Sequence, residues 1–336
     1  MNQNSIPQHG GRLQRAAREY DIPLMHWIDL STGINPRGWP VPPLAADDFI
    51  RLPEADDGLE AAAADYYGSA DLLPVAGSQE AIRELPRIRL ERFGRARVGV
   101  LAPGYEEHRY HWQRNGHQVE RLAADQIEAA LERLDCLVVI NPCNPSALRF
   151  ERSRLERWQQ RLAARNGWLV VDEAFLDAEP EQSLIRPLMP EGLVVLRSLG
   201  KFFGLAGLRV GFLFAADTIR QALLGSIGHW SVATASRRVA QAALRDLEWQ
   251  RAARMQLARG RQRLVQLLET TLQRPVMSTA LFATLEHPDA RRLADQLAQH
   301  AILVRYFEQP QRLRFGLPGH EEQWQRLSRA LSELER

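Results

Sequence analysis

The sequence predicts an α/β protein in which a large domain with a mainly parallel sheet is accompanied by a smaller α+β domain. Between about residue 75 and residue 215, short apolar runs alternate with helical patterns, and this alternation is typical of βαβ units. A long helical pattern and a short mixed segment of strands and helices come after it. A chain of 336 residues, 45% of them hydrophobic, is large enough for one main core and a satellite domain.

The predicted elements divide the chain into three parts. Residues 1–35 form an N-terminal arm and part of the small domain, and the proline-rich link 36–43 follows. Residues 36–235 form the large domain, whose expected strands are the apolar runs 97–101, 137–140, 168–171, 193–196 and 210–214. Because ligands of parallel sheets bind beyond the carboxyl ends of the strands, the residues directly after these runs are the first candidates for a site.

The third part, residues 236–336, combines a linking helix with the C-terminal portion of the small domain. A helical pattern rich in Arg and Ala covers residues 236–272. Strands are expected at 281–285, 302–306 and 312–315, with a helix at 289–300 and another at the end of the chain. This order is compatible with one small domain that is built from both ends of the chain.

Composition and charge argue against several classes of protein. The net charge is only +2 and acidic residues are interspersed with basic ones, so we expect no nucleic-acid partner. The N-terminus lacks the apolar core of a signal peptide, and no apolar run approaches the roughly 20 residues of a membrane span. Cys136 and Cys143 show no zinc-site spacing, which favours a reducing, cytoplasmic environment without a bound metal. A small molecule is therefore the expected partner.

Lys201 is the only lysine, which leaves arginine as 42 of the 43 basic residues. Arginine can replace lysine wherever a positive charge suffices, but its guanidinium cannot act as a neutral nucleophilic amine. The single remaining lysine is therefore a candidate for chemistry, although biased composition alone could also leave one lysine.

Two neighbouring strand ends bring a carboxylate and an amine toward one crevice. Asp172 follows the run 168–171, and Lys201 comes shortly after the run 193–196. A pyridoxal cofactor needs this pair, an amine to form a Schiff base and a carboxylate that keeps the ring nitrogen protonated. An Asp after a buried strand can equally cap the next helix.

The segment SLGKFFGLAGLRVG, residues 198–211, resembles the Schiff-base segment of fold-type I pyridoxal-phosphate enzymes, the aspartate aminotransferase superfamily. By this resemblance Lys201 holds pyridoxal 5'-phosphate, while Ser198 and Arg209 bind its phosphate. The implied fold is the α/β fold of these transferases, a large domain with a mainly parallel sheet plus a smaller α+β domain.

Three further segments resemble the same superfamily in the expected order. NPCNPS, residues 141–146, resembles the loop that places Asn144 on the ring's 3-oxygen. PGY, residues 103–105, resembles the segment whose aromatic ring, here Tyr105, stacks on the pyridine. In AGSQE, residues 76–80, the resemblance assigns the backbone of Gly77, Ser78 and Gln79 to the phosphate, at a helix N-terminus. Catalytic roles then fall to Lys201, Asp172 and Tyr105.

Some positions depart from the family pattern. Phe175 stands where many relatives have a tyrosine that hydrogen-bonds the 3-oxygen. Leu52 stands where related histidinol-phosphate aminotransferases have a tyrosine that reaches the neighbouring subunit's cofactor, and Tyr66 or Tyr67 could substitute for it. Ser146 and the following alanine replace the usual Thr-Gly.

Within the superfamily the sequence resembles most the branch of histidinol-phosphate aminotransferase and the threonine-phosphate decarboxylase of cobalamin biosynthesis. His9-Gly-Gly and DLSTGINP, residues 29–36, resemble the arm of the decarboxylase family, as does the ending LRFGLP, residues 313–318. The resemblance implies decarboxylation of L-threonine O-3-phosphate to (R)-1-amino-2-propanol O-2-phosphate, with Lys201 or a water returning a proton to the α-carbon.

A phosphorylated amino acid needs cations for its carboxylate and for its phosphate. Arg314 matches the family's arginine for the substrate carboxylate, although Arg312 would face the same side of a strand. Arg305 and His9 are the candidates for the substrate phosphate, and Asn35 in the arm is placed with them at the substrate.

Two other functions remain open at this point. A transaminase acting on histidinol phosphate or a similar compound would use the same core residues, and a non-catalytic relative could use the fold as a binding module. The intact set of Lys201, Asp172 and Arg209 argues against the second. The resemblance also implies a homodimer.

Overall fold

The computed structural model describes residues 9–334, and these form two compact units. The first contains residues 39–144 and 149–250, and the second contains residues 9–38, 145–148 and 251–334. The predicted division had its boundaries at residues 35 and 235. Residues 236–250 go with the first unit because helix α9 (Thr234–Arg245) packs against helix α3 (Leu59–Tyr67). Residues 1–8 of the predicted arm lie outside the described residues.

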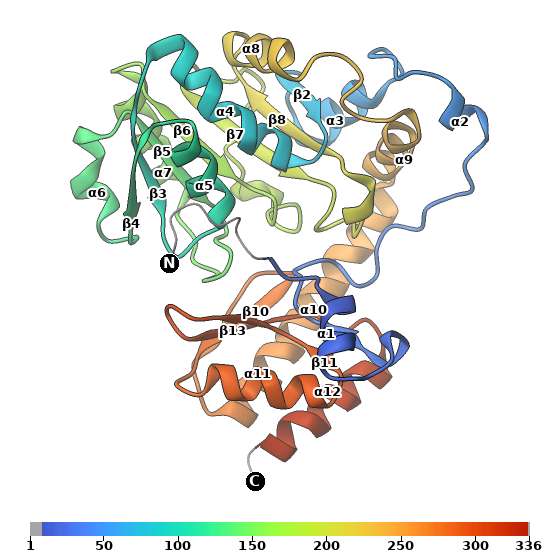
Figure 1. Cartoon of the computed structure of the whole chain (residues 1–336). Coiled ribbons are helices and arrows are strands. Elements are labelled where there is room, and N and C mark those ends of the chain that lie inside the picture. The colour runs from blue at the N-terminus through green and yellow to red at the C-terminus, as the bar shows by residue number, and fades with distance from the viewer. Residues whose placement is uncertain (1–8, 335–336) are drawn as a thin grey trace. The chain divides into compact units, whose positions relative to one another are not determined.

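The first unit is built on a seven-stranded sheet with the order β2-β8-β7-β6-β5-β3-β4 (Figure 1). Neighbouring strands from β4 to β7 are parallel, while β8 runs antiparallel to β7 and to β2. The predicted α/β fold with a mainly parallel sheet is confirmed. The strands are β2 (Leu72–Val75), β3 (Arg97–Leu101), β4 (Gln118–Leu122), β5 (Cys136–Ile140), β6 (Trp168–Asp172), β7 (Leu193–Ser198) and β8 (Gly211–Ala215).

The central strands are apolar because helices cover the sheet. β5 and β6 are buried along their whole length, as expected of strands with both faces covered. On one face, alternate strand residues such as Val138, Val170 and Val194 pack in a cluster with side chains of α4, α5 and α8, and Figure 1 shows α4 crossing in front of the sheet. The helices of this unit are α2 (Asp47–Ile50), α3, α4 (Ser78–Phe93), α5 (Glu106–Arg114), α6 (Ile127–Ala130), α7 (Arg152–Ala163), α8 (Asp217–Ile227) and α9, with short 3-10 turns at Leu131–Arg133, Pro180–Gln182 and Ala206–Leu208.

The predicted helix over residues 236–272 is two helices. α9 ends at Arg245 and α10 (Leu247–Leu272) begins two residues later. The carboxylate of Asp246 accepts hydrogen bonds from the Trp249 backbone N–H at 3.0 Å and from the Trp39 indole at 3.0 Å. Asp246 therefore caps the start of α10, which is the usual role of Asp before a helix.

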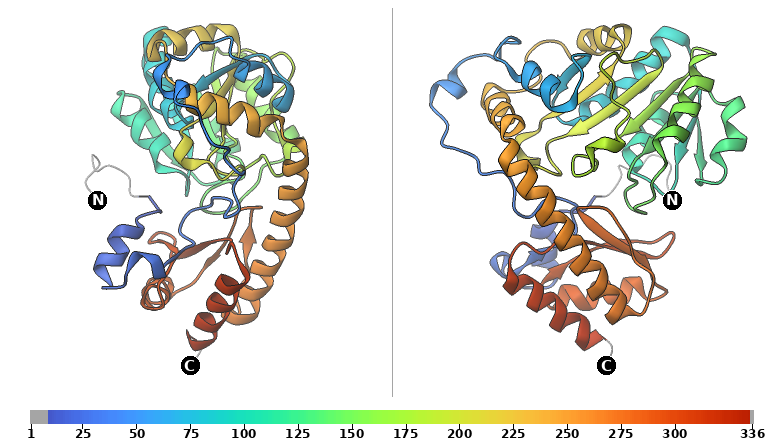
Figure 2. Two further views of the ribbon diagram at one scale, coloured as in Figure 1. Left: turned by 90° about the vertical axis from the view of Figure 1, so that its right-hand side faces the viewer. Right: turned by 180° about the vertical axis from the view of Figure 1, so that it is seen from behind.

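The second unit holds residues from both ends of the chain (Figure 2). The predicted strand 302–306 is divided in two. β11 (Ile302–Leu303) pairs in parallel with β1 (Ile28–Asp29) from the arm, and β12 (Arg305–Phe307) joins a separate sheet with the order β12-β13-β10-β9. The remaining elements are α1 (Leu13–Glu19), a 3-10 turn at Leu24–His26, β9 (Met277–Ser278), β10 (Phe282–Glu286), α11 (Ala290–Gln299), β13 (Arg312–Gly316) and α12 (Glu321–Leu334). No helix among residues 9–334 is long and apolar enough to cross a membrane.

Candidate active site

Neighbouring parallel strands of the first unit end in one row. Ile140 of β5 is in register with Asp172 of β6, and Asp172 is in register with Leu196 of β7. Asn144 and Lys201 follow the ends of β5 and β7 within a few residues. The predicted cofactor residues on these segments therefore leave the sheet at the same edge, where ligands of such sheets bind.

Both oxygens of the Asp172 carboxylate are held by the protein. Oδ1 accepts a hydrogen bond from the Ala174 N–H at 3.1 Å, and Oδ2 lies 3.1 Å from Nε2 of His108. Asp172 and His108 are both buried. The alternative of a helix cap does not apply, because β6 is followed by turns rather than by a helix.

Sequence reasoning missed His108. It lies on α5, three residues after Tyr105, and no strand end marks it. The available signal was the three-residue spacing between Tyr105 and His108. A side chain in the first turn of a helix can reach back toward the sheet edge at which the helix begins.

Lys201 lies in the loop 199–210 between the antiparallel strands β7 and β8. The loop is closed by hydrogen bonds from the Leu199 N–H to the Val210 carbonyl at 3.1 Å and from the Leu205 N–H to the Leu199 carbonyl at 3.2 Å. Nζ of Lys201 lies 5.3 Å from the centroid of the Phe175 ring. The residue that replaces the family's tyrosine is thus next to the amine.

Gly77 allows the guanidinium of Arg209 to lie against the turn before α4. Its φ of +72° is a left-handed conformation, and a Cβ atom there would lie 2.7 Å from one guanidinium nitrogen of Arg209. Ser78 is the first residue of this 16-residue helix, whose N-terminal N–H groups attract anions. Arg209 itself is exposed. A cation and a helix N-terminus are therefore combined at one accessible turn.

The sheet register joins this turn to Ser198. Gly211 at the start of β8 pairs with Ser198 on one side and with Val75 on the other. A Cβ atom on Gly211 would lie 2.6 Å from the Ser78 nitrogen, so only glycine allows this close backbone approach. The Ser198 hydroxyl accepts a hydrogen bond from the Gly200 N–H at 3.2 Å.

Tyr105 and Gln79 are hydrogen-bonded to each other. The Tyr105 hydroxyl donates to Oε1 of Gln79 at 3.1 Å, and the Gln79 amide donates to Glu107 at 2.7 Å. Burial, Glu107 and Asp172 raise the pKa of Tyr105 above its ordinary value, so the phenol stays protonated at neutral pH.

In the loop after β5, Asn141 and Asn144 have different environments. Asn141 is buried, and its side-chain amide exchanges two hydrogen bonds with the backbone of Phe150, at 2.9 Å and 3.2 Å. These bonds fix the course of the loop. Asn144 is half-buried, which suits the predicted ligand-binding role better.

In the second unit, Arg305 of β12 and Arg314 of β13 are direct cross-strand partners. Arg314 is buried and donates to the Ser31 carbonyl, and Arg305 donates to the His9 carbonyl at 3.3 Å. Burial and the neighbouring Arg305 lower the pKa of Arg314 to about 9, while Asp29 acts in the opposite direction. Both cations remain charged at neutral pH, and a bound anion would relieve their repulsion.

The structure separates Arg314 from the alternative Arg312. Arg312 forms an ion pair with Glu286 on the adjacent strand β10. Arg314 lies beside Arg305 instead, and its role as the substrate cation stays a prediction. Asn35 is buried in the arm, where its side-chain oxygen accepts a hydrogen bond from the Arg37 N–H at 3.0 Å.

Tyr67 does not take the place of the tyrosine missing at position 52. Its ring packs against Phe212 and Phe214 inside the first unit, and its hydroxyl is buried. Tyr66 packs edge-on against Phe203. Leu52 is 62% exposed.

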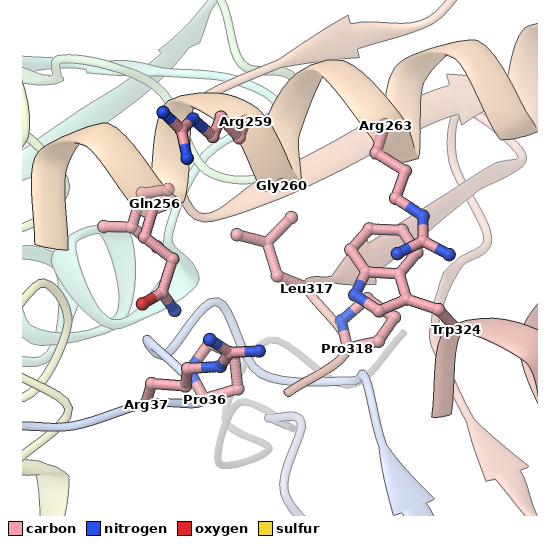
Figure 3. Close-up of a pocket in the computed structure, with 10 residues that line it drawn as sticks. Pro36, Arg37, Gln256, Arg259, Gly260, Arg263, Leu317, Pro318 and Trp324 are labelled. Carbon is pink, nitrogen blue, oxygen red and sulfur yellow. The ribbon is translucent and has the colours of Figure 1, made fainter. Parts of the chain in front are cut away.

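A cavity of about 180 Å³ lies in the second unit, between α10 and the segment after β13 (Figure 3). Leu317 projects into it, and the Arg263 guanidinium lies 4.5 Å from the centroid of the Trp324 ring. None of the residues predicted to bind cofactor or substrate lines this cavity. It is therefore distinct from the candidate active site.

The residues of the first unit fit pyridoxal phosphate. Lys201 offers an amine, Asp172 a buried and oriented carboxylate, and the Gly77 turn a phosphate cradle that a Cβ atom would fill. Among residues 9–334 no group of His, Cys, Asp or Glu side chains is placed to hold a metal ion.

Comparison with known proteins supports the same conclusion. Threonine-phosphate decarboxylase of Pseudomonas aeruginosa is 50% identical over 324 residues, which are 96% of this chain and 97% of the relative. Histidinol-phosphate aminotransferase 1 of Legionella pneumophila is 32% identical over 64% of this chain and 60% of its own length. The fold is also that of histidinol-phosphate aminotransferase from Sinorhizobium meliloti in complex with pyridoxal 5'-phosphate, with a TM-score of 0.81 at 22% identity over 98% of this chain and 95% of that one. Residues 47–331 match the sequence profile of aminotransferase class I and II. The chain therefore belongs to the aminotransferase class I and II family.

Proposed function

We propose that this protein is a pyridoxal-phosphate-dependent threonine-phosphate decarboxylase. It converts L-threonine O-3-phosphate to (R)-1-amino-2-propanol O-2-phosphate and carbon dioxide, a reaction that serves cobalamin biosynthesis. The observation that carries the proposal is the 50% identity with the enzyme of that name from Pseudomonas aeruginosa, which extends over nearly the whole of both chains.

Residues of the first unit would hold the cofactor. Lys201 supplies the amine that binds it, and Ser78, Ser198 and Arg209 receive its phosphate. Tyr105 would stack on the ring, and Asn144 would contact the 3-oxygen. The backbone of Gly77 and Gln79 completes the phosphate site.

Asp172 would hold a proton on the ring nitrogen, because His108 and the Ala174 N–H fix its carboxylate in one orientation. Pyridoxal phosphate, when bound, supplies a protonated ring that stabilises negative charge at the α-carbon of the substrate. After carbon dioxide leaves, the amine of Lys201 or a water delivers a proton to that carbon.

Residues of the second unit would bind the substrate. Arg314 receives the carboxylate, Arg305 and His9 receive the phosphate, and Asn35 lies with them at the substrate. The support is the electrostatics of the two arginines: burial lowers the pKa of both, Arg305 lowers the pKa of Arg314 further, and Arg12 lowers the pKa of Arg305 further. A dianionic substrate such as a phosphorylated amino acid relieves this repulsion.

An aminotransferase acting on histidinol phosphate is the alternative, because relatives of that name match a large part of the chain. Purified holoenzyme is mixed with L-threonine O-3-phosphate without a keto acid, and carbon dioxide and the visible spectrum are followed. We expect sustained release of carbon dioxide with the aldehyde form of the cofactor retained. Conversion to pyridoxamine phosphate without carbon dioxide would reject the decarboxylase and support the alternative.

We also propose that the protein is a cytoplasmic homodimer. Phe49, Ile50 and Leu52 form an apolar run that is between 62% and 76% exposed, which is unusual for a surface that faces only water. Cys136 and Cys143 are both buried and form no disulfide with each other, as is common in a reducing compartment. A monomeric mass by analytical ultracentrifugation of the holoenzyme would reject the dimer, and recovery in a membrane fraction would reject the location.

A further inference from the structure

Glu107 lies at the centre of a buried hydrogen-bond chain beside the candidate cofactor site. Its side chain is 8% exposed, and its Oε2 atom accepts a hydrogen bond from the Gln79 amide at 2.7 Å. Nε2 of His111, one turn further along α5, lies 3.1 Å from the same oxygen. At the other end of the chain, the Tyr105 hydroxyl donates to Gln79 at 3.1 Å.

The chemistry of these groups determines which group donates and which accepts in each hydrogen bond of this series. An ionised carboxylate has no proton to donate, so it must receive the NH2 group of the Gln79 amide. The amide oxygen of Gln79 then faces Tyr105, and an amide oxygen can only accept. The Tyr105 hydroxyl is therefore obliged to donate to Gln79. Burial lowers the pKa of His111, so its neutral ring can donate from Nε2 to the same carboxylate.

We propose that Glu107 is a positioning residue, which fixes the orientation of the Gln79 amide and through it the place and hydrogen-bond direction of Tyr105. Glu107 does not touch the cofactor in this role. It acts on the ring that would stack on the pyridine, because removal of its carboxylate would release the Gln79 amide that holds Tyr105.

The series of hydrogen bonds from Tyr105 to Glu107 also joins two parts of the candidate cofactor site. Gln79 is the second residue of α4, next to the turn that would receive the phosphate, and Tyr105 directly precedes α5. Glu107 therefore couples the turn that would receive the phosphate to the aromatic ring that would stack on the pyridine. A glutamine at position 107 would keep the shape but permit the Gln79 amide to turn around, because an amide can donate as well as accept.

The test is Glu107→Gln, read out by pyridoxal-phosphate affinity and by circular dichroism in the cofactor's visible band. We expect the dissociation constant for reconstitution of the apoenzyme to rise about threefold to tenfold, the effect of one displaced hydrogen bond. The visible dichroism should weaken as well, because the ring over the cofactor is no longer held in one place. A role in packing alone would not alter this signal in an isosteric variant.

A double-mutant cycle with Tyr105→Phe makes the test specific. In the Tyr105→Phe background, which lacks the donor, Glu107→Gln should produce little further change in affinity or dichroism. Gln79→Met breaks the same chain at its middle and should behave in the same way. Full additivity of either pair would overturn the proposal, as would wild-type affinity and dichroism in Glu107→Gln.

Glu106→Gln is the matched control. Glu106 is the adjacent carboxylate on the same helix, and it pairs with the half-buried Arg109 at 2.6 Å rather than with Gln79. We expect wild-type affinity and dichroism in this variant, and an effect equal to that of Glu107→Gln would contradict the proposed direction of the chain. The inference rests on the proposed cofactor but not on the proposed substrate. Failure to release carbon dioxide would reject the decarboxylase and leave both readouts valid.

Discussion

In the first unit the carboxylate of Asp172 is held by two internal donors, whereas in the second unit the guanidinium of Arg314 lies beside another arginine. The carboxylate of Asp172 thus has two hydrogen-bond donors within its own unit, while Arg314 and Arg305 donate to the backbone carbonyls of Ser31 and His9. The candidate substrate residues carry a concentrated positive charge, with lowered pKa values at Arg305 and Arg314. We therefore expect the fold to hold the candidate cofactor residues in place before a ligand binds, and an anionic ligand to stabilise the two arginines.

The largest effect is expected from removal of the positive charge of Arg314, which tests whether substrate binding and cofactor binding depend on different units. We expect Arg314→Gln to raise the KM for L-threonine O-3-phosphate by about 30-fold or more, since loss of one partner of a buried charge pair costs about 2–5 kcal/mol. Cofactor affinity should stay within about twofold, a change of less than 1 kcal/mol. Steady-state kinetics and cofactor titration measure the two effects. Arg312→Gln on the same strand is the control, and an equal rise of KM there would remove the distinction between the two arginines.

An intermediate effect is expected from the first unit at Gly77. In Gly77→Ala the new Cβ atom would lie 2.7 Å from the Arg209 guanidinium, in a backbone conformation with φ of +72°. The Cβ atom would displace the guanidinium from the turn, and loss of one charge-assisted contact to the phosphate, about 1.5–3 kcal/mol, should weaken pyridoxal-phosphate binding about 10-fold to 150-fold. At saturating cofactor the KM for substrate should not change. Gly207→Ala, where a Cβ atom meets nothing within 4 Å, should bind the cofactor normally. Equal losses in both variants would exclude the contact with Arg209 as the cause.

The smallest expected effect is on the free energy of unfolding, and it concerns His117 in the first unit, whose neutral ring has hydrogen-bond partners at both nitrogens. Nδ1 of His117 accepts a hydrogen bond from the Ala96 N–H at 3.0 Å, and its Nε2 lies 2.8 Å from the Pro86 carbonyl. Burial, together with Arg89 and Arg95, lowers the pKa of His117 below its ordinary 6.5. The unfolded chain therefore binds this proton first, so the stability that His117 contributes is present above about pH 6.5 and is lost as the pH falls toward the folded-state pKa.

Urea unfolding at about pH 7.5 and about pH 5.5 tests this expectation. The wild type should lose more unfolding free energy between the two values than His117→Gln, whose side chain does not titrate. Equal losses in the two proteins would show that His117 is not a source of the acid sensitivity.

Much of the first unit could be predicted because its strands are buried on both faces and read as continuous apolar runs. The ends of β5, β6 and β7 followed directly, and with them the segments that carry Asn144, Asp172 and Lys201. β4 was missed because it is an edge strand with a polar sequence, and β2 was missed because it contains Pro74. Edge strands need fewer apolar residues, so their pattern is weak.

The partners of the candidate site were harder to predict than its members. His108 and Glu107 lie on a helix, and only the folding of α5 against the sheet brings them to Asp172 and Gln79. The break at Asp246 left a signal in the sequence, an Asp followed by a helical pattern, but a continuous pattern of Arg and Ala on both sides concealed it. The family resemblance singled out Arg314, but the sequence could not show the partners of individual arginines, and Glu286 as the partner of Arg312 emerged only from strand register.

The half-buried position of Lys201 has a practical consequence for handling this protein. Reagents that modify amines, such as succinimidyl esters and dialdehyde cross-linkers, find a single side chain to attack besides the amino terminus. Labelling, immobilisation on an amine-reactive surface or conjugation through lysine would therefore modify the residue that we propose as the cofactor-binding amine. Tags and probes meant to leave the enzyme intact are better attached through carboxylates or an introduced cysteine.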